Sequence, residues 1–474
     1  MWLRVFLGNL MVKAKTTFSR KEISILCAQA TDPDEVISKP AVGRLFSDVV
    51  ESLCDSFLPR RVALYDRIFA QVIDYCRHLP DGQGMDDLLK RFGLSDERAI
   101  LARKKNVEKM RKFSVANRKK VKKICVLSRV TIGADVAVTG VVLSKLVNIF
   151  PGVCIVVIGP KKLVEVFGGH PNISIKEVPY VRRGGLLGRL NSWVDLVCVI
   201  DEERRGLRPD EFLLIDPDSR LTQLGLLPVI PKDDGYYFFQ SRTYAKARSG
   251  RIGELTANWL DQVFGPGSQK TYPEIFIDKN ILKIGRACAQ KLSHSGARPI
   301  VCINFGVGGN EKKRVSPDFE DNLVRDILNQ GAAVILDKGF GDEVDMVNVL
   351  VSKLRAQGKI VLDANEGNIF KLAKESAWPC DVLTWEGGLA VFGALIASSN
   401  VYMGYDSGFQ HIASAQGVPI VDIFFGAPSS LFIKRWTPYG KNRVKIVGGQ
   451  SLKKDDVTPD HVLSALKKLL SEQP

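Results

Sequence analysis

The stretch at residues 398–426, SSNVYMGYDSGFQHIASAQGVPIVDIFFG, joins two short apolar runs through a turn that carries a carboxylate, a hydroxyl and a glycine. The apolar runs are typical of buried strands, and the small residues between them predict a helix packed closely on a sheet. Asp406, Ser407 and Gly408 are therefore expected at the carboxyl end of a strand, where they begin a helix. Its free amide groups and dipole favour an anion. A plain helix cap is the alternative.

The same alternation of strand and helix extends in both directions from this stretch. Before it, four apolar runs predict one sheet: KICVLSRV, VCIVVIG, DLVCVID and FLLIDPD. Around it, five more predict a second sheet: PIVCINFGVGG, AAVILDKG, KIVLDA, VYMGYDSG and PIVDIFFG. Apolar strands separated by helices are typical of parallel α/β sheets, whose ligands bind at the carboxyl ends of the strands. We therefore expect two doubly wound sheets that face each other across a cleft, with a closing helix at TPDHVLSALKKLL.

The first part of the chain has a different pattern. Residues 20–115 place apolar residues at steps of three and four, which predicts a small all-α domain. The expected organisation is a helical domain with a basic linker (1–117), a first Rossmann-like domain (118–270) and a second Rossmann-like domain with the closing helix (271–474).

Charge is concentrated in one segment of the chain, whose net charge is +15. Residues 103–123 hold eleven Lys and Arg against one Glu. A solvated helix face or linker is one interpretation, and peripheral contact with an anionic lipid surface is another. Nucleic acid ranks last, because Phe113 is the one aromatic residue among these bases.

The remaining composition predicts a cytoplasmic protein. Nine cysteines occur without a CxxC pair, which is typical of reduced core residues. The chain shows no uninterrupted apolar stretch near the ~20 residues of a membrane span and no cleavable leader pattern.

Three other segments place polar residues after predicted strands. Asp135, in RVTIGADVAVTG, follows the first strand and could be a base for a hydroxyl or a helix cap. Gly306, Gly308 and Gly309 form a glycine-rich turn, followed by Lys312 and Lys313, either of which could meet a phosphate. Glu343 and His411 stand near helix starts, where a surface glutamate and an interior histidine are the structural alternatives.

These motifs resemble glycosyltransferase family 9, the heptosyltransferase-like enzymes. The stretch YMGYDSGFQHIASAQGVPIVDIFFG, followed by RWTPYG, is similar to the family's Asp-Thr-Gly…His segment, and the resemblance extends over about residues 120 to 445. It implies the two-domain GT-B fold and an inverting, metal-independent sugar transfer, mostly known from lipopolysaccharide core synthesis. The family's best-known donor is ADP-heptose. A glycan or glycolipid is the implied acceptor, and no cofactor is expected.

The resemblance also implies a role for each matched residue. Asp135 corresponds to the proposed catalytic base, although Ala134 stands between it and Gly133. Lys313 is the match for a lysine at the donor diphosphate, and Glu343 for a glutamate at the donor ribose. The other implied donor-binding residues are Gly306, Gly308, Gly309, Asp406, Ser407, Gly408 and His411.

Asp216, Asp218 and Arg220 follow a strand of the first sheet, so they could line the acceptor side or form a structural turn with an Asp–Arg pair. We expect no metal site, because no DxD pair ends a strand of the donor half. Two alternatives stay open: a nucleotide-sugar 2-epimerase of the same fold, and a catalytically degenerate nucleotide-sugar-binding scaffold.

Overall fold

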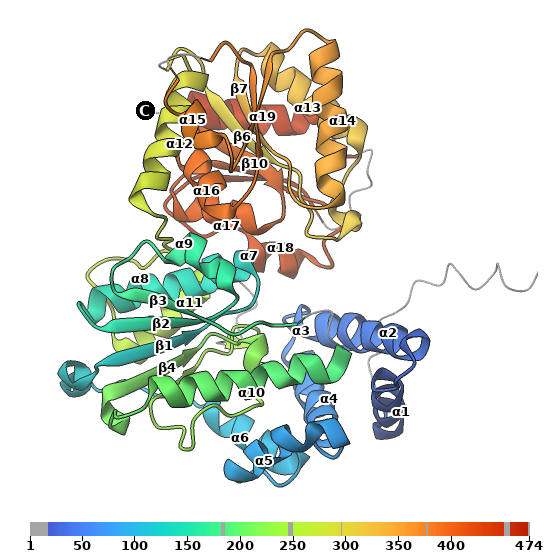
Figure 1. Cartoon of the computed structure of the whole chain (residues 1–474), viewed down its shortest axis with the longest axis vertical. Helices are drawn as coiled ribbons and strands as arrows, with labels where there is room; N and C mark the ends of the chain where they lie inside the picture. The colour runs from blue at the N-terminus through green and yellow to red at the C-terminus, as the bar shows by residue number, and fades with distance from the viewer. Residues whose placement is uncertain are drawn as a thin grey trace, which may run out of the picture.

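The molecule contains two parallel sheets, each in its own α/β domain, and the C-terminal domain lies above the N-terminal one in Figure 1. The computed structural model describes residues 18–181, 185–244, 250–294, 296–375, 378–449 and 456–472. Sheet A has the strand order β3-β2-β1-β4-β5 and sheet B the order β12-β11-β10-β6-β7-β9-β8. All pairings between neighbouring strands are parallel. This arrangement confirms the predicted α/β fold class.

The strands have the following bounds. Sheet A contains β1 (Lys123–Leu127), β2 (Cys154–Gly159), β3 (Ile173–Glu177), β4 (Phe212–Asp216) and β5 (Tyr236–Phe238). Sheet B contains β6 (Ile300–Asn304), β7 (Ala333–Asp337), β8 (Val361–Asn365), β9 (Val382–Glu386), β10 (Val401–Tyr405), β11 (Ile420–Phe424) and β12 (Val444–Gly448).

Helices cover both faces of each sheet. In the first domain they are α7 (Ile132–Ala134), the π-helix η4 (Asp135–Thr139), α8 (Gly140–Ile149), α9 (Val164–Phe167), α10 (Gly185–Glu203) and α11 (Ile252–Phe264). In the second they are α12 (Lys279–Leu292), α13 (Pro317–Asn329), α14 (Asp342–Ala356), α15 (Ile369–Leu372), α16 (Leu389–Ala397), α17 (Gly408–Ala415), α18 (Ser430–Trp436) and α19 (Pro459–Ser471).

One predicted strand is wrong. DLVCVID, at residues 195–201, lies inside α10 rather than in sheet A. Its buried residues Trp193, Leu196, Val197 and Ile200 recur at helical steps and face the sheet. A short apolar run does not distinguish a strand from a helix, because it spans too few residues to separate the two periodicities.

The N-terminal region is helical, as predicted. It contains α1 (Arg20–Ala30), α2 (Glu35–Arg44), η1 (Leu45–Glu51), α3 (Ser52–Cys54), α4 (Pro59–Arg77), α5 (Gln83–Arg91) and α6 (Glu97–Val107). Its core is continuous with one face of sheet A, since Phe69 and Ile73 of α4 belong to the same buried cluster as Cys125 and Leu127 of β1. Helix α10 lies between the two (Figure 1). The predicted domain boundaries at 117/118 and 270/271 stay predictions.

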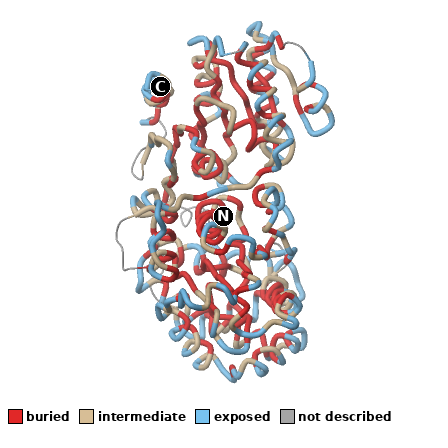
Figure 2. Tube along the Cα trace, turned by 90° about the vertical axis from the view of Figure 1, so that its left-hand side faces the viewer, coloured by how far each residue is buried: buried red, intermediate tan, exposed pale blue. Residues whose placement is uncertain are grey.

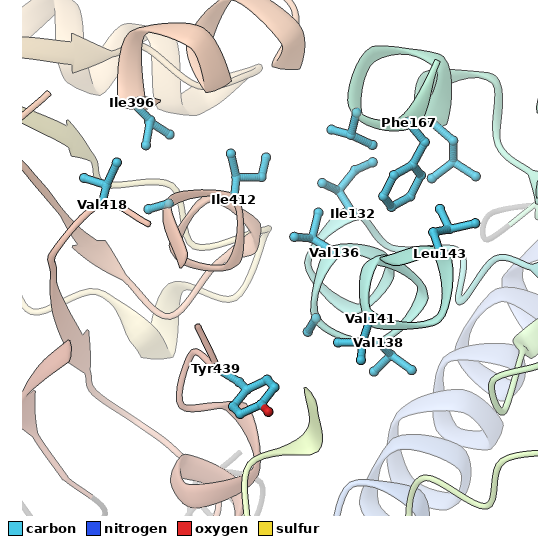
Figure 3. Close-up of a cluster of buried hydrophobic side chains, with 14 of the residues drawn as sticks. Ile132, Val136, Val138, Val141, Leu143, Phe167, Ile396, Ile412, Val418 and Tyr439 are labelled. Carbon is cyan, nitrogen blue, oxygen red and sulfur yellow. The ribbon is translucent and has the colours of Figure 1, made fainter. Parts of the chain in front are cut away.

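The two α/β domains also share a buried cluster. Ile132 and Val136 of the first domain face Ile412 of α17 in the second (Figure 3). Buried residues therefore continue through the junction of the two halves (Figure 2). One helical stretch, Ile132–Ile149, has the length and apolarity of a membrane span, but 67% of it is buried, as in the core helix of a folded domain.

Candidate active site

The turn quoted from the sequence lies where predicted, at the carboxyl edge of sheet B. Asp406 follows β10, and Ser407 is the residue before the first turn of α17. Ser407 has an extended backbone (φ −147°, ψ −176°), and its hydroxyl lies 3.4 Å from Asn304 Oδ1 at the end of β6. The structure therefore places the first amides of α17 at the edge where parallel sheets bind ligands.

A cation is held at this helix start. Lys313 Nζ lies 2.6 Å from Asp406 Oδ2 and donates to the Asp406 carbonyl at 3.0 Å. Its neighbour Lys312 is exposed, and its backbone amide bonds to Asn310. Of the two lysines left open by the sequence, Lys313 is the one that meets the motif.

His411 lies beneath the turn and not on the surface of the site. Its side chain is buried, and its ring packs edge-on against Trp436 at 6.0 Å between centroids. Burial lowers the pKa of His411 to about 4, so the imidazole is neutral at physiological pH. Gln410 Nε2 donates to Asp406 Oδ1 at 2.8 Å and fixes the carboxylate from the same helix.

The glycine-rich turn and Glu343 form one connected unit. Gly308 (φ +61°) and Gly309 (φ +79°) adopt backbone conformations that favour glycine. Glu343 Oε1 accepts from the amide of Val307 at 3.0 Å, and a side chain on Gly306 would begin 3.1 Å from Glu343 Oε2. Glu343 therefore ties the turn after β6 to the start of α14, and its predicted contact with a ribose stays a prediction.

Two strand-end residues of this edge were not predicted. Asn304 Nδ2 donates to Asp337 Oδ2 at 2.7 Å, and the two residues are register partners on β6 and β7. Burial raises the pKa of Asp337 to about 7. A polar residue ending an apolar run, as in VCIN and VILD, is the sequence signal that marks them.

Asp422 is a second unpredicted acid, inside the apolar strand β11. It is fully buried, and neither carboxylate oxygen has a hydrogen-bond partner in the part of the chain that the structure describes. Burial and the nearby Asp406 carboxylate raise the pKa of Asp422 well above its usual range. A carboxylate within the run IVDIFF is the signal that could have found it.

A cavity of about 920 Å³ opens beside this edge. Loops after β7, β8 and β9 line it, together with Lys162 and Glu165 of the first domain. Glu165 Oε2 accepts from the amide of Ala390 at 3.0 Å, and Glu366 Oε1 accepts from the amide of Gly388 at 3.0 Å. Two carboxylates, one of them from the opposite domain, thus occupy the amino end of α16.

Asp135 lies in the first domain, opposite the turn of α17. It is fully buried, and accepts from the Ser128 hydroxyl at 2.8 Å, the Arg129 amide at 2.7 Å and the Thr139 hydroxyl at 2.9 Å. Burial raises its pKa to about 6, although these hydrogen bonds act in the opposite direction. The carboxylate is therefore fixed within its own domain, and its predicted role as a base stays a prediction.

The turn that carries Asp135 directly contacts the turn of Asp406, Ser407 and Gly408. A side chain on Gly133 would begin 3.0 Å from Gly408 Cα and 3.6 Å from the His411 ring. Ile132 and Val136 beside it meet Ile412 of α17 (Figure 3). Asp135 and Asp406 thus belong to different domains, and the turns that carry them are in contact.

The tentative acceptor residues lie apart from this contact. Asp216 accepts from Ser219 N, the Thr222 hydroxyl and the Tyr236 hydroxyl, which is the bonding of a structural turn. Asp218 pairs with Arg242, at 2.7 Å, rather than with Arg220. All lie at the carboxyl end of β4 beneath the N-terminal helices, and their role toward an acceptor stays a prediction.

Metal ligands do not gather in the described residues: no group of three or more His, Cys, Asp and Glu side chains is placed to hold an ion. Positive charge at the site comes instead from Lys313 and the amides of α17.

Comparison with known proteins agrees with this geometry. Residues 363–464, which include the whole quoted turn, match the family model described as glycosyltransferase family 9 (heptosyltransferase). A search of curated proteins found no match.

Two solved structures share the fold. A family 9 glycosyl transferase from Veillonella parvula DSM 2008 is 20% identical, with a TM-score of 0.53 over 74% of this chain and 98% of that chain. The E. coli ADP-heptose lps heptosyltransferase II is 17% identical, with a TM-score of 0.50 over 74% of this chain and 99% of that one. The family match over residues 363–464 and the shared fold confirm the predicted resemblance to glycosyltransferase family 9.

Proposed function

We propose that the chain moves a sugar, heptose-like in class, from a nucleotide-diphosphate donor to a glycan or glycolipid acceptor, with inversion and without a metal. The observation that carries this proposal is the contact of Lys313 with Asp406 at the amino end of α17. A fixed cation beside free helix amides favours a diphosphate, whose charge grows as the glycosidic bond breaks.

The donor has room on the same edge. Its phosphates meet Ser407, Gly408 and Lys313, and the nucleoside extends toward the cavity of about 920 Å³. Glu343 lies between the phosphate-binding turn and the cavity. It accepts from the amide of Val307 in the glycine-rich turn and lies against Gly339 of the cavity wall. We place the ribose at this carboxylate, because it accepts hydroxyl protons well.

Asp135 acts as the base in this proposal. It takes the proton of an acceptor hydroxyl as the oxygen attacks the anomeric carbon, and the bond to the diphosphate breaks on the opposite face. A pKa of about 6 suits a group that accepts a proton near neutral pH. Because Gly133 touches Gly408, the two domains must separate at this contact to admit the sugar.

We also propose that the protein is cytoplasmic and that residues 103–123 can bind it peripherally to a lipid surface. This surface is less charged than the sequence suggests, because at least five of its bases form ion pairs: Arg103, Lys104, Lys120, Lys122 and Lys123.

Donor turnover with and without acceptor tests the function. The full chain is incubated with a panel of nucleotide-diphosphate sugars, ADP-heptose among them, in the presence or absence of glycan acceptors. We expect nucleoside diphosphate release that depends on acceptor. Release of free sugar without acceptor would indicate the epimerase, and binding without turnover the scaffold.

A further inference from the structure

Three arginines meet at the carboxyl end of sheet A, beside Asp135, whose carboxylate accepts from the Arg129 amide at 2.7 Å. Arg129 follows β1, Arg220 follows β4 and Arg242 follows β5, and we call them the arginine cluster. Arg129 and Arg242 are each only 6% exposed. Guanidinium groups stay charged when buried, so this edge of the sheet holds concentrated positive charge.

The buried carboxylate of Asp218 contacts Arg242 directly and is linked to Arg129 through Ser241. Asp218 Oδ2 lies 2.7 Å from Arg242 Nη1 and accepts from the Ser241 hydroxyl at 2.7 Å. Arg129 reaches the same network through Ser241 Oγ, at 2.7 Å, and the Pro217 carbonyl. Burial, followed by the charge of Arg242, lowers the pKa of Arg129 to about 10.

Several donors of the cluster have no partner in the described part of the chain. Arg129 Nε, Arg220 Nη1 and Arg242 Nε are buried without a hydrogen bond. The Tyr65 hydroxyl and both polar atoms of the Gln223 amide are in the same condition. Native proteins rarely leave so many buried polar atoms unpaired in one place, so the cluster is built for a further partner. An oxyanion supplies acceptors to several N–H groups at once.

The N-terminal helices close this site. Asp55, in the turn between α3 and α4, places Oδ1 3.9 Å from Arg242 Nη2, and its side chain is 36% exposed. Tyr65 of α4 is fully buried beneath it. Asp55 thus lies beside the cluster at the outer limit of an ion pair with Arg242, in a position that the carboxylate or phosphate of a ligand would take.

We propose that the arginine cluster is a second anion-binding site, for the carboxylate or phosphate group of an anionic acceptor, and that the N-terminal helices complete it. The site itself rests on the unpaired arginine donors. Its assignment to an acceptor rests on the proposed transferase function.

Thermal unfolding of the full chain in inorganic phosphate tests the site. Lys313→Gln is included as a background, because phosphate can also bind at the donor turn. We expect a saturable rise in melting temperature that persists in Lys313→Gln and is absent in chloride of equal ionic strength. Loss of the whole effect in Lys313→Gln would overturn the proposal.

Two substitutions test whether phosphate binds at the arginine cluster and not elsewhere on the molecule. Arg220→Gln in the Lys313→Gln background should weaken phosphate binding about tenfold or more, whereas Asp55→Asn should strengthen it by removing a competing carboxylate. Arg325→Gln is the control, since Arg325 is a half-exposed arginine of α13 that pairs with Asp326. Equal phosphate effects in all three variants would show adventitious binding. If Arg220→Gln does not fold, Asp55→Asn decides alone, and unchanged affinity in it contradicts the proposal.

The source of the anion is resolved with sugar probes. Glucuronate and glucose 1-phosphate present a carboxylate and a phosphate, and glucose is the neutral control. Stabilisation by either charged sugar supports the site, and the stronger of the two identifies the group it prefers; equal effects of glucose would contradict it. Phosphate binding without any sugar transfer would leave the site standing and remove the acceptor assignment. Transfer without phosphate binding at the cluster would overturn the site and leave the transferase function standing.

Discussion

Lys312 and Lys313 are adjacent in the sequence, yet they have different surroundings. Lys313 contacts Asp406 at 2.6 Å, whereas Lys312 is exposed. We therefore expect Lys313→Gln to weaken binding of nucleoside diphosphates by about 10- to 100-fold, the equivalent of ~1.4–2.7 kcal/mol for a charge-assisted contact. Titration calorimetry with ADP and other nucleoside diphosphates measures the change.

Lys312→Gln is the matched control for this prediction. It removes the same charge one residue away and should change the affinity less than about twofold, because solvent screens an exposed lysine. Equal losses in the two variants would mean that general charge, and not the contact with Asp406, binds the diphosphate.

Asp135 gives the reaction a specific pH dependence. Burial raises its pKa to about 6, and a base acts only when ionised. We expect kcat/KM to rise as the pH increases through about 6 and then to level. Asp135→Asn should lower kcat by ~10²–10⁴-fold and remove this acidic limb. Steady-state transfer assays between pH 5 and 8 measure both effects.

The Asp135 carboxyl group also makes the stability of the folded chain depend on pH. Its pKa is higher in the folded chain than the ordinary carboxyl value, so folding favours the protonated form. This contribution is fully present below the ordinary carboxyl pKa and is lost as the pH rises through about 6. Asp135→Asn, which keeps an acceptor for the Arg129 amide, should fold and melt with a weaker pH dependence in that range. A wild-type kcat in the folded variant would exclude Asp135 as the base.

At the scale of elements, the sequence predicts what a local pattern determines. The strand end before Asp406 was found because an apolar run stops there. The run at 195–201 was misassigned because so short an apolar run fits a strand as well as a helix. The short edge strand β5 and the partnership of Asp218 with Arg242 were missed, since they depend on contacts between distant segments. Such contacts follow from tertiary packing and have no local signature.

The contact between α7 and α17 yields a prediction at this scale. A methyl group on Gly133 would begin 3.0 Å from Gly408 Cα, which is too close for two backbones to keep their positions. We expect Gly133→Ala to destabilise the closed arrangement by ~1–3 kcal/mol, as overpacking does, and to raise KM for the donor. Melting temperature and donor kinetics measure the two effects.

Gly84→Ala provides the comparison. Gly84 lies in α5, and a methyl group there meets nothing within 4 Å. Because alanine reduces the freedom of the unfolded chain, this variant should be neutral or more stable by ~0.5–1 kcal/mol with unchanged kinetics. If Gly133→Ala behaved in the same way, the two turns would not be in contact during turnover.

For the whole molecule, the N-terminal helices are less separate than their sequence pattern suggests. Helical periodicity correctly predicted α4 and its neighbours, but it gave no information about what their apolar faces cover. Those faces pack into the core of sheet A, and Asp55 reaches the arginine cluster at its carboxyl edge. About a quarter of this chain lies outside the 74% that each of the two solved structures covers.

A shared core predicts shared unfolding. Phe69 of α4 is fully buried and stacks on Tyr65 at 5.0 Å, in the cluster that includes Cys125 and Leu127 of β1. Phe69→Ala should cost ~3–5 kcal/mol. Hydrogen exchange followed by mass spectrometry should therefore show faster exchange in β1 and β4 as well as in α4, with little change in β6 and β10.

Phe319→Ala is the equivalent substitution in the core of sheet B. Phe319 of α13 is buried with Val301 and Ile303 of β6, in a cluster separate from that of Phe69. Its loss should accelerate exchange in sheet B and leave the N-terminal helices protected. If Phe69→Ala loosened α4 alone, the helices would unfold independently of sheet A. The arginine cluster would then be closed by a detachable cap, and acceptor access would depend on movement of that cap as well as on separation of the two α/β domains at Gly133 and Gly408.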